Sequence, residues 1–393
     1  MLENIKQFTP KILLAFLGLL IGVVVLETSL RIYYWATDRQ LFQLKPVRTT
    51  LKFYDNEIFG SALVPNQKGW FVPHTREYFT WVEVNSSGWP DVGHTIEKPK
   101  GTYRILLLGD SFVENTQVPF EKRFFRQLEN SLQKTLKRKI EIIALGRGNT
   151  GTAQQLLILQ NTGLVYKPDI VVHMFLTAND VKNNSPVLQN DPYLPYFKLD
   201  EKGQLEKIQQ KRHGDRELAK IKDIVKNLRA VELILSVRQK IQEAKTARAH
   251  EYPVDYHVYD EIYDQDYQDA WAITKKLILE TRKETEESGA KYILVALSNN
   301  EQVHQNIRDV LMKTYPAMKT ANLDFEKPDK ILQVFCKEEK IDCLFMLPFY
   351  KNYVVEHPGE TTHNRLEGHW NQTGTDLAAQ FLFKNLPPYF SIK

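Results

Sequence analysis

The feature that most constrains the fold is a series of five short apolar runs spread along the chain. Each reads as a buried strand, and the first ends directly in Gly109. Amphipathic helical patterns lie between the runs. Strands that alternate with helices favour a parallel sheet with helices on both faces. The five runs cover residues 104–108, 140–145, 169–176, 292–297 and 341–345.

The helices expected between these strands follow from apolar residues at helical spacing. Residues 121–137 predict an amphipathic helix whose inner face carries Phe124, Phe125, Leu128, Leu132 and Leu136. Further helices are expected over residues 153–164 and near residues 327–339, and a last one begins near Thr375.

The N-terminus indicates a membrane anchor. Residues 12–26 are 15 apolar residues in a row, preceded by lysines, and no small-x-small cleavage site follows them. Glu27 and Arg31 are spaced to pair on one helix face. Continuing the helix to Trp35 gives 24 residues, enough to cross a hydrocarbon core of about 30 Å. We therefore predict an uncleaved, single-pass anchor, with nearly everything after residue 45 on the extracytoplasmic side, in the periplasm or at the cell surface.

These signals divide the chain into three parts. Residues 1–44 form the anchor, residues 45–100 a lead-in segment packed on the main domain, and residues 101–393 the main domain. The rhythm of strands and helices stops over residues 185–288, which we expect to be a helical insertion, cap or lid that opens with a hairpin near residues 201–203. The expected fold class is α/β: a flavodoxin-like, doubly wound parallel sheet of about five strands, with an N-terminal transmembrane helix and a helical insertion.

The charge of the chain argues against a nucleic-acid partner, because the formal net charge is only +4. It hides an asymmetry. Residues 207–248 hold 12 Lys and Arg against 5 Asp and Glu, whereas residues 251–290 hold 4 against 11. Adjacent stretches of opposite sign predict neighbouring helices that face one another.

The chain has two cysteines, Cys336 and Cys343, too few for a metal framework or a disulfide scaffold. We interpret them as two small buried side chains. A disulfide between them is the alternative if this part of the chain lies outside the cytosol.

The first candidate motif, Leu108-Gly109-Asp110-Ser111-Phe112, stands where the first strand gives way to a helix. At the carboxyl end of a parallel strand, a short turn exposes a side chain to the crevice above the sheet. The following helix points its free N–H groups and the positive end of its dipole at the same place. Ser111 is therefore a candidate nucleophile in need of a base, with Asp110 as a supporting residue. The alternative is an ordinary turn or helix cap.

Two more polar loops follow the next two strands. The loop from Gly146 to Gly151 is a plain strand–helix turn, a phosphate-binding loop, or the source of a backbone N–H for an oxyanion. The loop Thr177-Ala178-Asn179-Asp180 offers the Asn179 amide to an oxyanion, and Asp180 can hold the loop. Taken alone, an Asn-Asp pair is most often a turn.

The last motif, Glu367-Gly368-His369-Trp370-Asn371, comes just before the final expected helix. A histidine near an acid is the pattern of a general base oriented by a carboxylate, although lone histidines are usually structural. All four motifs follow a predicted strand or precede a helix. A doubly wound sheet would therefore gather them at one edge.

In this order along the chain, the four motifs resemble those of the SGNH hydrolases, also called GDSL-type esterases, over roughly residues 100–180 and 290–385. Val84-Asn85-Ser86-Ser87-Gly88, together with the anchor, resembles the membrane-anchored bacterial branch of that family. The resemblance implies that Ser111 is the nucleophile, Asn179 an oxyanion donor and His369 the general base.

Three positions depart from the family pattern. Ala178 precedes Asn179, where the family usually has Gly. The glycine whose N–H serves the oxyanion falls at Asn149, with Gly148 just before it, so the expected donor is the N–H of Asn149 or of Gly148. Asn adopts left-handed geometry more readily than most residues. The acidic partner of His369 is Glu367, two residues earlier, where relatives carry Asp, and the extra methylene changes its reach.

These residues imply a serine esterase or acyl hydrolase that needs no cofactor and no metal, since the sequence has no clustered metal ligands. The anchor suggests that the substrate is an ester, O-acyl or O-acetyl, of a cell-envelope glycan or lipid. One alternative is an O-acetyltransferase that receives its acyl group from a membrane partner. Another is a catalytically inactive binding or assembly protein.

Overall fold

The computed structural model describes residues 2–37, 49–73, 75–208 and 252–390, with a few single positions between residues 228 and 241. The chain divides into two compact units. The first consists of Met1–Lys45 and Gly214–Ala249, and the second of Pro46–His213 and His250–Lys393.

The second unit is built on a five-stranded sheet in which all strands are parallel, as predicted. Its strand order is β11-β10-β7-β5-β6. Counted from β5, this is the 2-1-3-4-5 order of a flavodoxin-like fold, so the predicted fold class is confirmed. The strands are β5 (Thr102–Gly109), β6 (Lys139–Gly146), β7 (Ile170–Leu176), β10 (Lys291–Leu297) and β11 (Cys343–Phe345).

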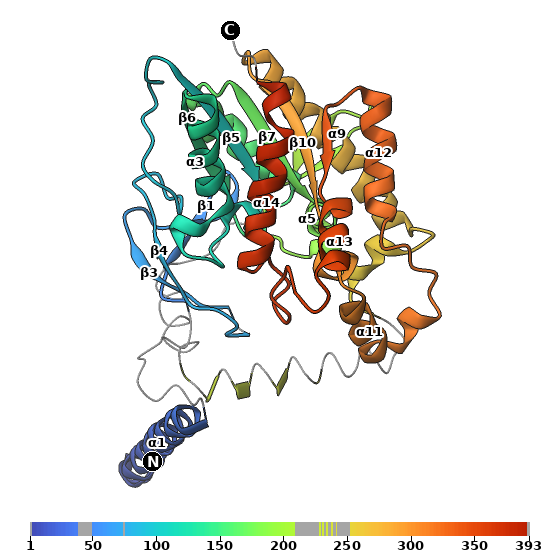
Figure 1. Ribbon diagram of the computed structural model, residues 1–393. Coiled ribbons are helices and arrows are strands. Elements are labelled where there is room, and N and C mark those ends of the chain that lie inside the picture. The colour runs from blue at the N-terminus through green and yellow to red at the C-terminus, as the bar shows by residue number, and fades with distance from the viewer. Residues whose placement is uncertain are drawn as a thin grey trace. The chain divides into compact units, whose positions relative to one another are not determined.

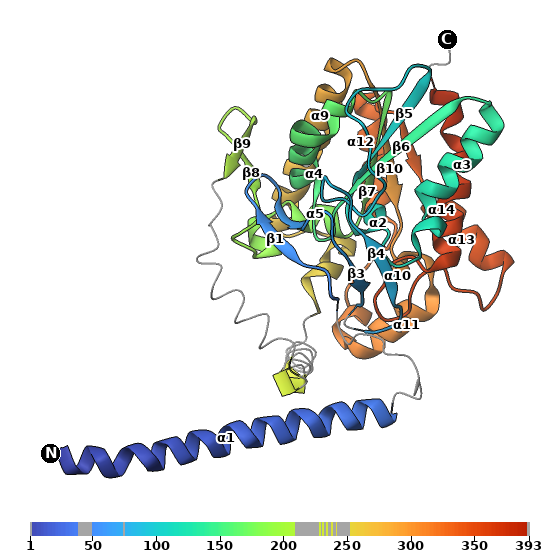
Figure 2. The same ribbon diagram turned by 90° about the vertical axis from the view of Figure 1, so that its left-hand side faces the viewer.

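Helices cover both faces of this sheet (Figures 1 and 2). Side chains of β5 alternate between the faces, with Ile105 and Leu107 packed on one side and Leu106 and Leu108 on the other. The first face is covered by α3 (Phe124–Leu136), α13 (Leu347–Glu356) and α14 (Gln372–Asn385). The second face is covered by α4 (Thr152–Ile158), α9 (Gln265–Glu287) and α12 (Lys327–Glu339).

The position of α9 corrects part of the predicted insertion. The helix buries Leu277 and Ile278 in the core beneath the sheet, so it is the crossover between β7 and β10 and not a lid over the strand ends. Its inner stripe includes Thr274, Thr281 and Thr285, whose hydroxyls each donate to the carbonyl four residues back at 2.7 Å. Because these inner positions are polar and the helix is rich in charged residues, the sequence of α9 reads as that of a solvent-exposed helix.

The rest of the predicted insertion is described in part. The short helix α5 (Asn179–Asn183) precedes it. The insertion begins with α6 (Pro186–Gln189) and continues into the hairpin of β8 (Tyr196–Leu199) and β9 (Leu205–Ile208), which confirms the predicted hairpin. The basic stretch predicted to face an acidic partner lies almost entirely outside the described residues.

The lead-in segment contributes two further hairpins and a small core of Leu51, Leu63, Val82 and Val84. The hairpins pair β1 (Phe53–Asn56) with β2 (Gly60–Leu63), and β3 (Lys68–Phe71) with β4 (Thr80–Glu83). Arg123, fully buried at the start of α3, donates to the Pro90 carbonyl and ties this segment to the sheet domain.

In the first unit, α1 (Leu2–Thr37) is a single helix of 36 residues. Its Leu14–Tyr33 stretch of 20 residues has a mean hydropathy of 1.9, long and apolar enough to cross a membrane. A signal sequence near an N-terminus shares this property. The predicted ion pair between Glu27 and Arg31 forms at 2.7 Å.

The interpretation of Cys336 and Cys343 as separate buried thiols is wrong, because the two form a disulfide. Lys340 ends α12 in a left-handed conformation, with φ of 53°. The chain therefore turns back at once, and β11 starts beside the last turn of the helix. This places the two Cα atoms 6.3 Å apart, within the span of a disulfide.

Removing this disulfide is expected to cost modest stability. It closes a loop with a sequence separation of only 7, for which chain entropy gives roughly 2 kcal/mol. The free energy of unfolding of the Cys336→Ser/Cys343→Ser variant should therefore be lower than that of the wild type by this amount. The variant should unfold at a lower urea concentration. Adding reductant should shift the wild type to the same midpoint and leave the variant unchanged. A wild type whose urea midpoint does not change in reductant, although both thiols are shown to be free, would contradict this expectation.

Candidate active site

Four loops meet at the carboxyl edge of the sheet. Ser111 opens the short helix α2 (Ser111–Glu114) directly after β5, and the loop after β6 runs beside it. Asn179 opens α5 directly after β7, the other neighbour of β5. β5 and β7 flank the point where the strand order reverses, which is where open α/β sheets bind their ligands. The sequence motifs are therefore gathered at one edge, as predicted.

Ser111 and His369 form the centre of the site. The serine Oγ lies 2.6 Å from Nε2 of His369, although the two residues are 258 positions apart in the sequence. The ring of Phe112 packs on the His369 ring with centroids 4.9 Å apart. Behind them, Trp370 is fully buried. A neutral His369 protonated on Nδ1 can accept the serine proton on Nε2.

Glu367 approaches the other ring nitrogen of His369. Its Oε1 lies 2.6 Å from Nδ1, and its Oε2 accepts the backbone N–H of His369 at 3.3 Å. Among the described residues, Nδ1 nevertheless has no partner with hydrogen-bond geometry, because the carboxylate lies out of line with the N–H. Glu367 thus serves His369 as a close charge and a poorly aligned acceptor, which follows from its position only two residues away.

The electrostatic surroundings favour a protonated His369. Burial by itself lowers the pKa of His369, but the carboxylate of Glu367, followed by those of Asp110 and Glu114, outweighs it. The net pKa of His369 is raised above its ordinary value of 6.5. A general base must be neutral, so this site is expected to work on the alkaline side of that value.

Replacing Glu367 by Gln should change the pH dependence as well as the rate. Without the carboxylate, the pKa of His369 falls, and the acid limb of the profile of kcat/KM against pH moves to lower pH. An aligned carboxylate is worth about 10⁴-fold in kcat; the out-of-line contact leads us to expect roughly 10- to 100-fold. Hydrolysis of p-nitrophenyl acetate across pH measures both, with exposed Glu360→Gln as control. An unmoved acid limb would remove Glu367 from the site.

Three hydrogen-bond donors of the motif loops are left without an acceptor in the part of the chain that the structure describes. Within the described residues, the backbone N–H groups of Ser111 and Asn149 and the side-chain amide of Asn179 donate to no protein group. Asn149 has φ of 62°, the left-handed conformation expected for it. Gly148 differs from the expectation, because its N–H donates to Glu114 Oε2 at 3.1 Å. Of the two alternatives in this loop, only Asn149 keeps a free N–H.

The two supporting aspartates are buried and hold the loops. Asp110 accepts the Phe112 N–H at 2.9 Å, and burial raises the pKa of Asp110 to about 6. Asp180 accepts the Leu176 N–H at 3.0 Å and the Gln155 amide at 3.2 Å. Burial, followed by the charge of Asp110, raises the pKa of Asp180. Both therefore fix the backbone that presents Ser111 and Asn179.

Sequence reasoning missed several groups around these residues. Glu114 forms a buried ion pair with Arg147 at 2.7 Å, and Arg147 in turn donates to the Ser61 carbonyl of the lead-in segment at 2.9 Å. The lead-in also sends Glu77 and Tyr78 to the loop of His369. Glu114 follows Ser111 by three residues on one helical turn and could have been inferred. Nothing in the sequence marks Glu77 or Tyr78.

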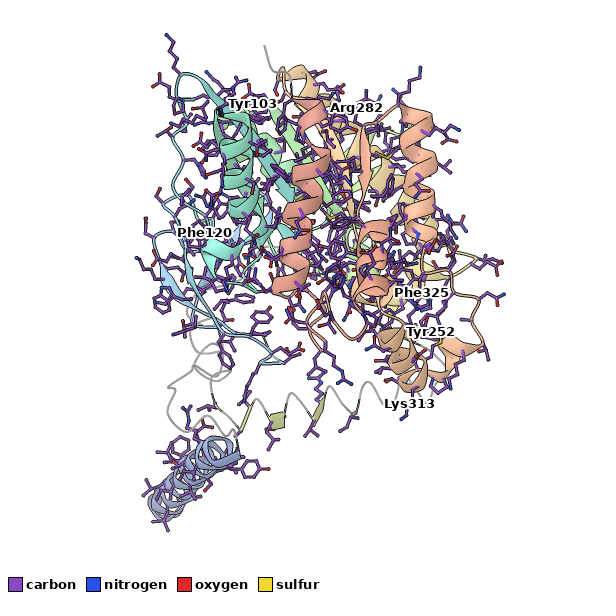
Figure 3. All side chains as sticks on the ribbon, in the orientation of Figure 1. Tyr103, Phe120, Tyr252, Arg282, Lys313 and Phe325 are labelled. Atoms are coloured by element: carbon purple, nitrogen blue, oxygen red, sulfur yellow. A yellow bond between two sulfur atoms is a disulfide. The ribbon has the colours of Figure 1, made fainter. Side chains whose placement is uncertain are left out.

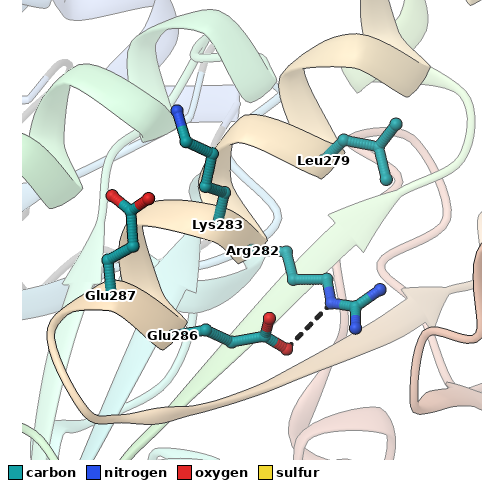
Figure 4. Close-up of a pocket in the computed structure, with 5 residues that line it drawn as sticks. All are labelled: Leu279, Arg282, Lys283, Glu286 and Glu287. Carbon is teal, nitrogen blue, oxygen red and sulfur yellow. Dashed lines mark hydrogen bonds and ion pairs between the residues drawn. The ribbon is translucent and has the colours of Figure 1, made fainter.

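A surface hollow elsewhere on the molecule does not belong to this site. It has a volume of about 500 Å³ and lies at the end of α9, where Arg282 and Glu286 pair at 2.8 Å (Figure 4). Arg282 and Tyr103 lie at the amino edge of the sheet, whereas Tyr252 and Phe325 lie at the opposite edge (Figure 3). No group of three or more His, Cys, Asp or Glu side chains that could hold a metal ion occurs in the part of the chain that the structure describes.

Comparisons with known proteins find only distant structural likenesses. No protein-family model and no curated protein matches the sequence. Among solved structures, an acetyl xylan esterase is similar with 10% identity and a TM-score of 0.39, covering 72% of this chain and 98% of its own. A GDSL-like lipase from Bacteroides thetaiotaomicron has 12% identity and a TM-score of 0.37, with coverage of 76% and 93%. A lipase/acylhydrolase from Enterococcus faecalis has 14% identity and a TM-score of 0.37, with coverage of 74% and 98%. Likenesses this distant do not establish a shared activity.

Proposed function

We propose that this protein is a serine esterase or acyl hydrolase of the SGNH type. The observation that carries the proposal is the 2.6 Å contact between Ser111 Oγ and His369 Nε2. It lies at a sheet edge where three N–H donors have no partner among the residues that the structure describes. An activated hydroxyl beside free donors is the arrangement that acyl transfer requires.

In the proposed mechanism, His369 takes the Ser111 proton as the serine oxygen attacks an ester carbonyl. The tetrahedral oxyanion accepts hydrogen bonds from the N–H groups of Ser111 and Asn149 and from the amide of Asn179. His369 then gives its proton to the leaving alcohol. Water attacks the acyl-serine by the same route and releases the acid. Glu367 stabilises the imidazolium through its charge.

Asn179 is the one side chain among these donors, so its contribution can be measured directly. Asn179→Ala is expected to lower kcat by roughly 10²- to 10³-fold with little change in KM, because the bond forms fully only to the oxyanion. Steady-state hydrolysis of p-nitrophenyl acetate tests this. Asn352→Ala, at an exposed position of α13, is the control. A loss confined to KM would assign Asn179 to substrate binding instead.

We further propose that the enzyme is anchored by α1 and acts outside the cytoplasm, on an ester of a cell-envelope glycan or lipid. The apolar stretch Leu14–Tyr33 supports the anchor. The disulfide between Cys336 and Cys343 supports an oxidising compartment. Full-length protein that leaves the membrane fraction at high pH without detergent would contradict the anchor.

A serine-directed fluorophosphonate tests the proposal on the full-length protein in detergent. An activated Ser111 displaces fluoride from phosphorus and retains the fluorescent group. We expect wild type to be labelled and Ser111→Ala to remain unlabelled. Ser185→Ala, which removes the serine that caps α6, is the control and should be labelled like wild type. Absence of labelling in folded wild type would refute the hydrolase, and an inactive binding protein would become the leading interpretation.

A further inference from the structure

The carboxylate of Glu77, in the lead-in segment, accepts hydrogen bonds from the loop that carries His369. Glu77 lies between β3 and β4, about as far from His369 in sequence as Ser111 is. Its Oε1 accepts the Leu366 N–H at 2.9 Å. Its Oε2 accepts the Leu366 N–H at 3.0 Å and the Glu367 N–H at 2.7 Å. Two consecutive backbone N–H groups thus converge on one carboxylate, as in anion-binding nests.

Glu77 itself is held on the same body as the nucleophile. Thr80, at the start of β4, donates its hydroxyl to the carbonyl of Thr116, two residues beyond the end of α2. Tyr78 stacks on Phe71 of β3 with ring centroids 6.2 Å apart. The segment that carries Glu77 therefore cannot shift without disturbing the residues just after Ser111.

The loop of His369 has little else to hold its tip. The Asn364 N–H donates to the His369 carbonyl at 2.7 Å, and the Gly368 N–H donates back to Asn364 at 3.0 Å. Between these bonds, the Leu366 side chain is 69% exposed and contributes little packing. The chain then turns at Gly368 with φ of 86°. The backbone that directs the Glu367 carboxylate is thus fixed largely from outside the loop.

We propose that Glu77 is a positioning residue of the active site: it fixes the backbone of Glu367 and thereby keeps the Glu367 carboxylate beside Nδ1 of His369. The inference rests on the proposed function for its catalytic meaning. Tyr78 lies close to the same carboxylate. Burial, followed by the charge of Glu367, raises the pKa of Tyr78, so its phenol stays protonated.

Glu77→Gln tests this role. An amide offers one acceptor oxygen and turns an NH₂ group toward a backbone N–H, so the grip on the loop loosens while the side-chain shape is kept. The control is Glu83→Gln in β4, whose exposed carboxylate pairs with Lys68 at 2.8 Å. In full-length protein, we expect Glu77→Gln to lower kcat roughly tenfold, with KM little changed, and Glu83→Gln to behave like wild type.

The pH profile separates positioning from mere structural support. His369 is faced by the carboxylates of Glu367, Asp110 and Glu114 and by the neutral ring of His363. If Glu77 acts through Glu367, the acid limb of kcat/KM moves to lower pH in Glu77→Gln. The Glu77→Gln/Glu367→Gln double variant should then have its acid limb at the same pH as Glu367→Gln alone. An unmoved limb in the single variant, or additive shifts in the double variant, would overturn the proposal.

Titration of the His369 ring by NMR keeps this test independent of activity. We expect a lower pKa of His369 in Glu77→Gln than in wild type, whether or not the protein hydrolyses esters. A wild type that shows this pKa shift but is not labelled by the fluorophosphonate would refute the hydrolase and leave the coupling intact. An active wild type without the shift would refute the coupling alone.

Discussion

His369→Ala is expected to lower kcat/KM for p-nitrophenyl acetate by about 10⁴-fold or more, close to the effect of removing Ser111 itself. Nucleophile and base act as one unit, so loss of either removes nearly the whole contribution of both. The 2.6 Å contact between the two side chains is the structural reason. What activity remains should come from the oxyanion donors and from binding.

The loss must come from chemistry and not from folding. His357→Ala, at the exposed end of α13, removes a histidine of the same protein whose ring stacks on Tyr353. It should retain the wild-type rate. Both variants should unfold at similar denaturant concentrations. A rate for His369→Ala within tenfold of wild type would mean that another group deprotonates Ser111.

Gly146→Ala should be the most damaging single-methyl change in the site. A Cβ at Gly146 would lie 2.1 Å from the backbone N of Glu114 and 2.5 Å from the carbonyl carbon of Val113. Both atoms belong to α2, which carries Ser111, so neither can rotate away as a side chain would. The helix must move bodily. We expect a loss of about 3 kcal/mol or more in the free energy of unfolding, and no fluorophosphonate labelling.

Urea denaturation measures the first effect and labelling the second. Gly93→Ala is the matched control, because a Cβ there has no atom within 4 Å. It should leave stability and labelling unchanged. A Gly146→Ala protein as stable as wild type would show that α2 moves relative to β6 more freely than the buried packing suggests.

The sheet could be predicted because its evidence is local. A strand buried on both faces needs a continuous apolar run, and each of the five runs became a strand. The proximity of Ser111 and His369 could be predicted for a related reason, because each motif adjoins an element whose position the sheet determines. The free N–H of Asn149 was foreseeable from the tolerance of Asn for a positive φ.

What the sequence did not predict depends on pairing between distant segments. Gly148 was expected to offer its N–H, but Glu114 occupies it, and only the three-dimensional neighbourhood brings them together. The grip of Glu77 on Leu366 joins residues 289 positions apart. The disulfide depended on a tight reversal at Lys340, which has no side-chain signature. The buried stripe of α9 was missed because it is narrow and the rest of the helix is charged.

The sheet face beneath α14 has a consequence for the order in which this protein can become active. That face presents Ile105, Leu107 and Val172, and its cover includes a helix that is synthesised long after the strands. A chain emerging from the ribosome therefore exposes an apolar sheet surface and a serine without its base. Late arrival of residues 347–385 closes the surface and supplies His369 in one step. In the proposed mechanism, catalytic competence therefore coincides with completion of the core, and a partly made chain is prone to aggregate before it can hydrolyse an ester.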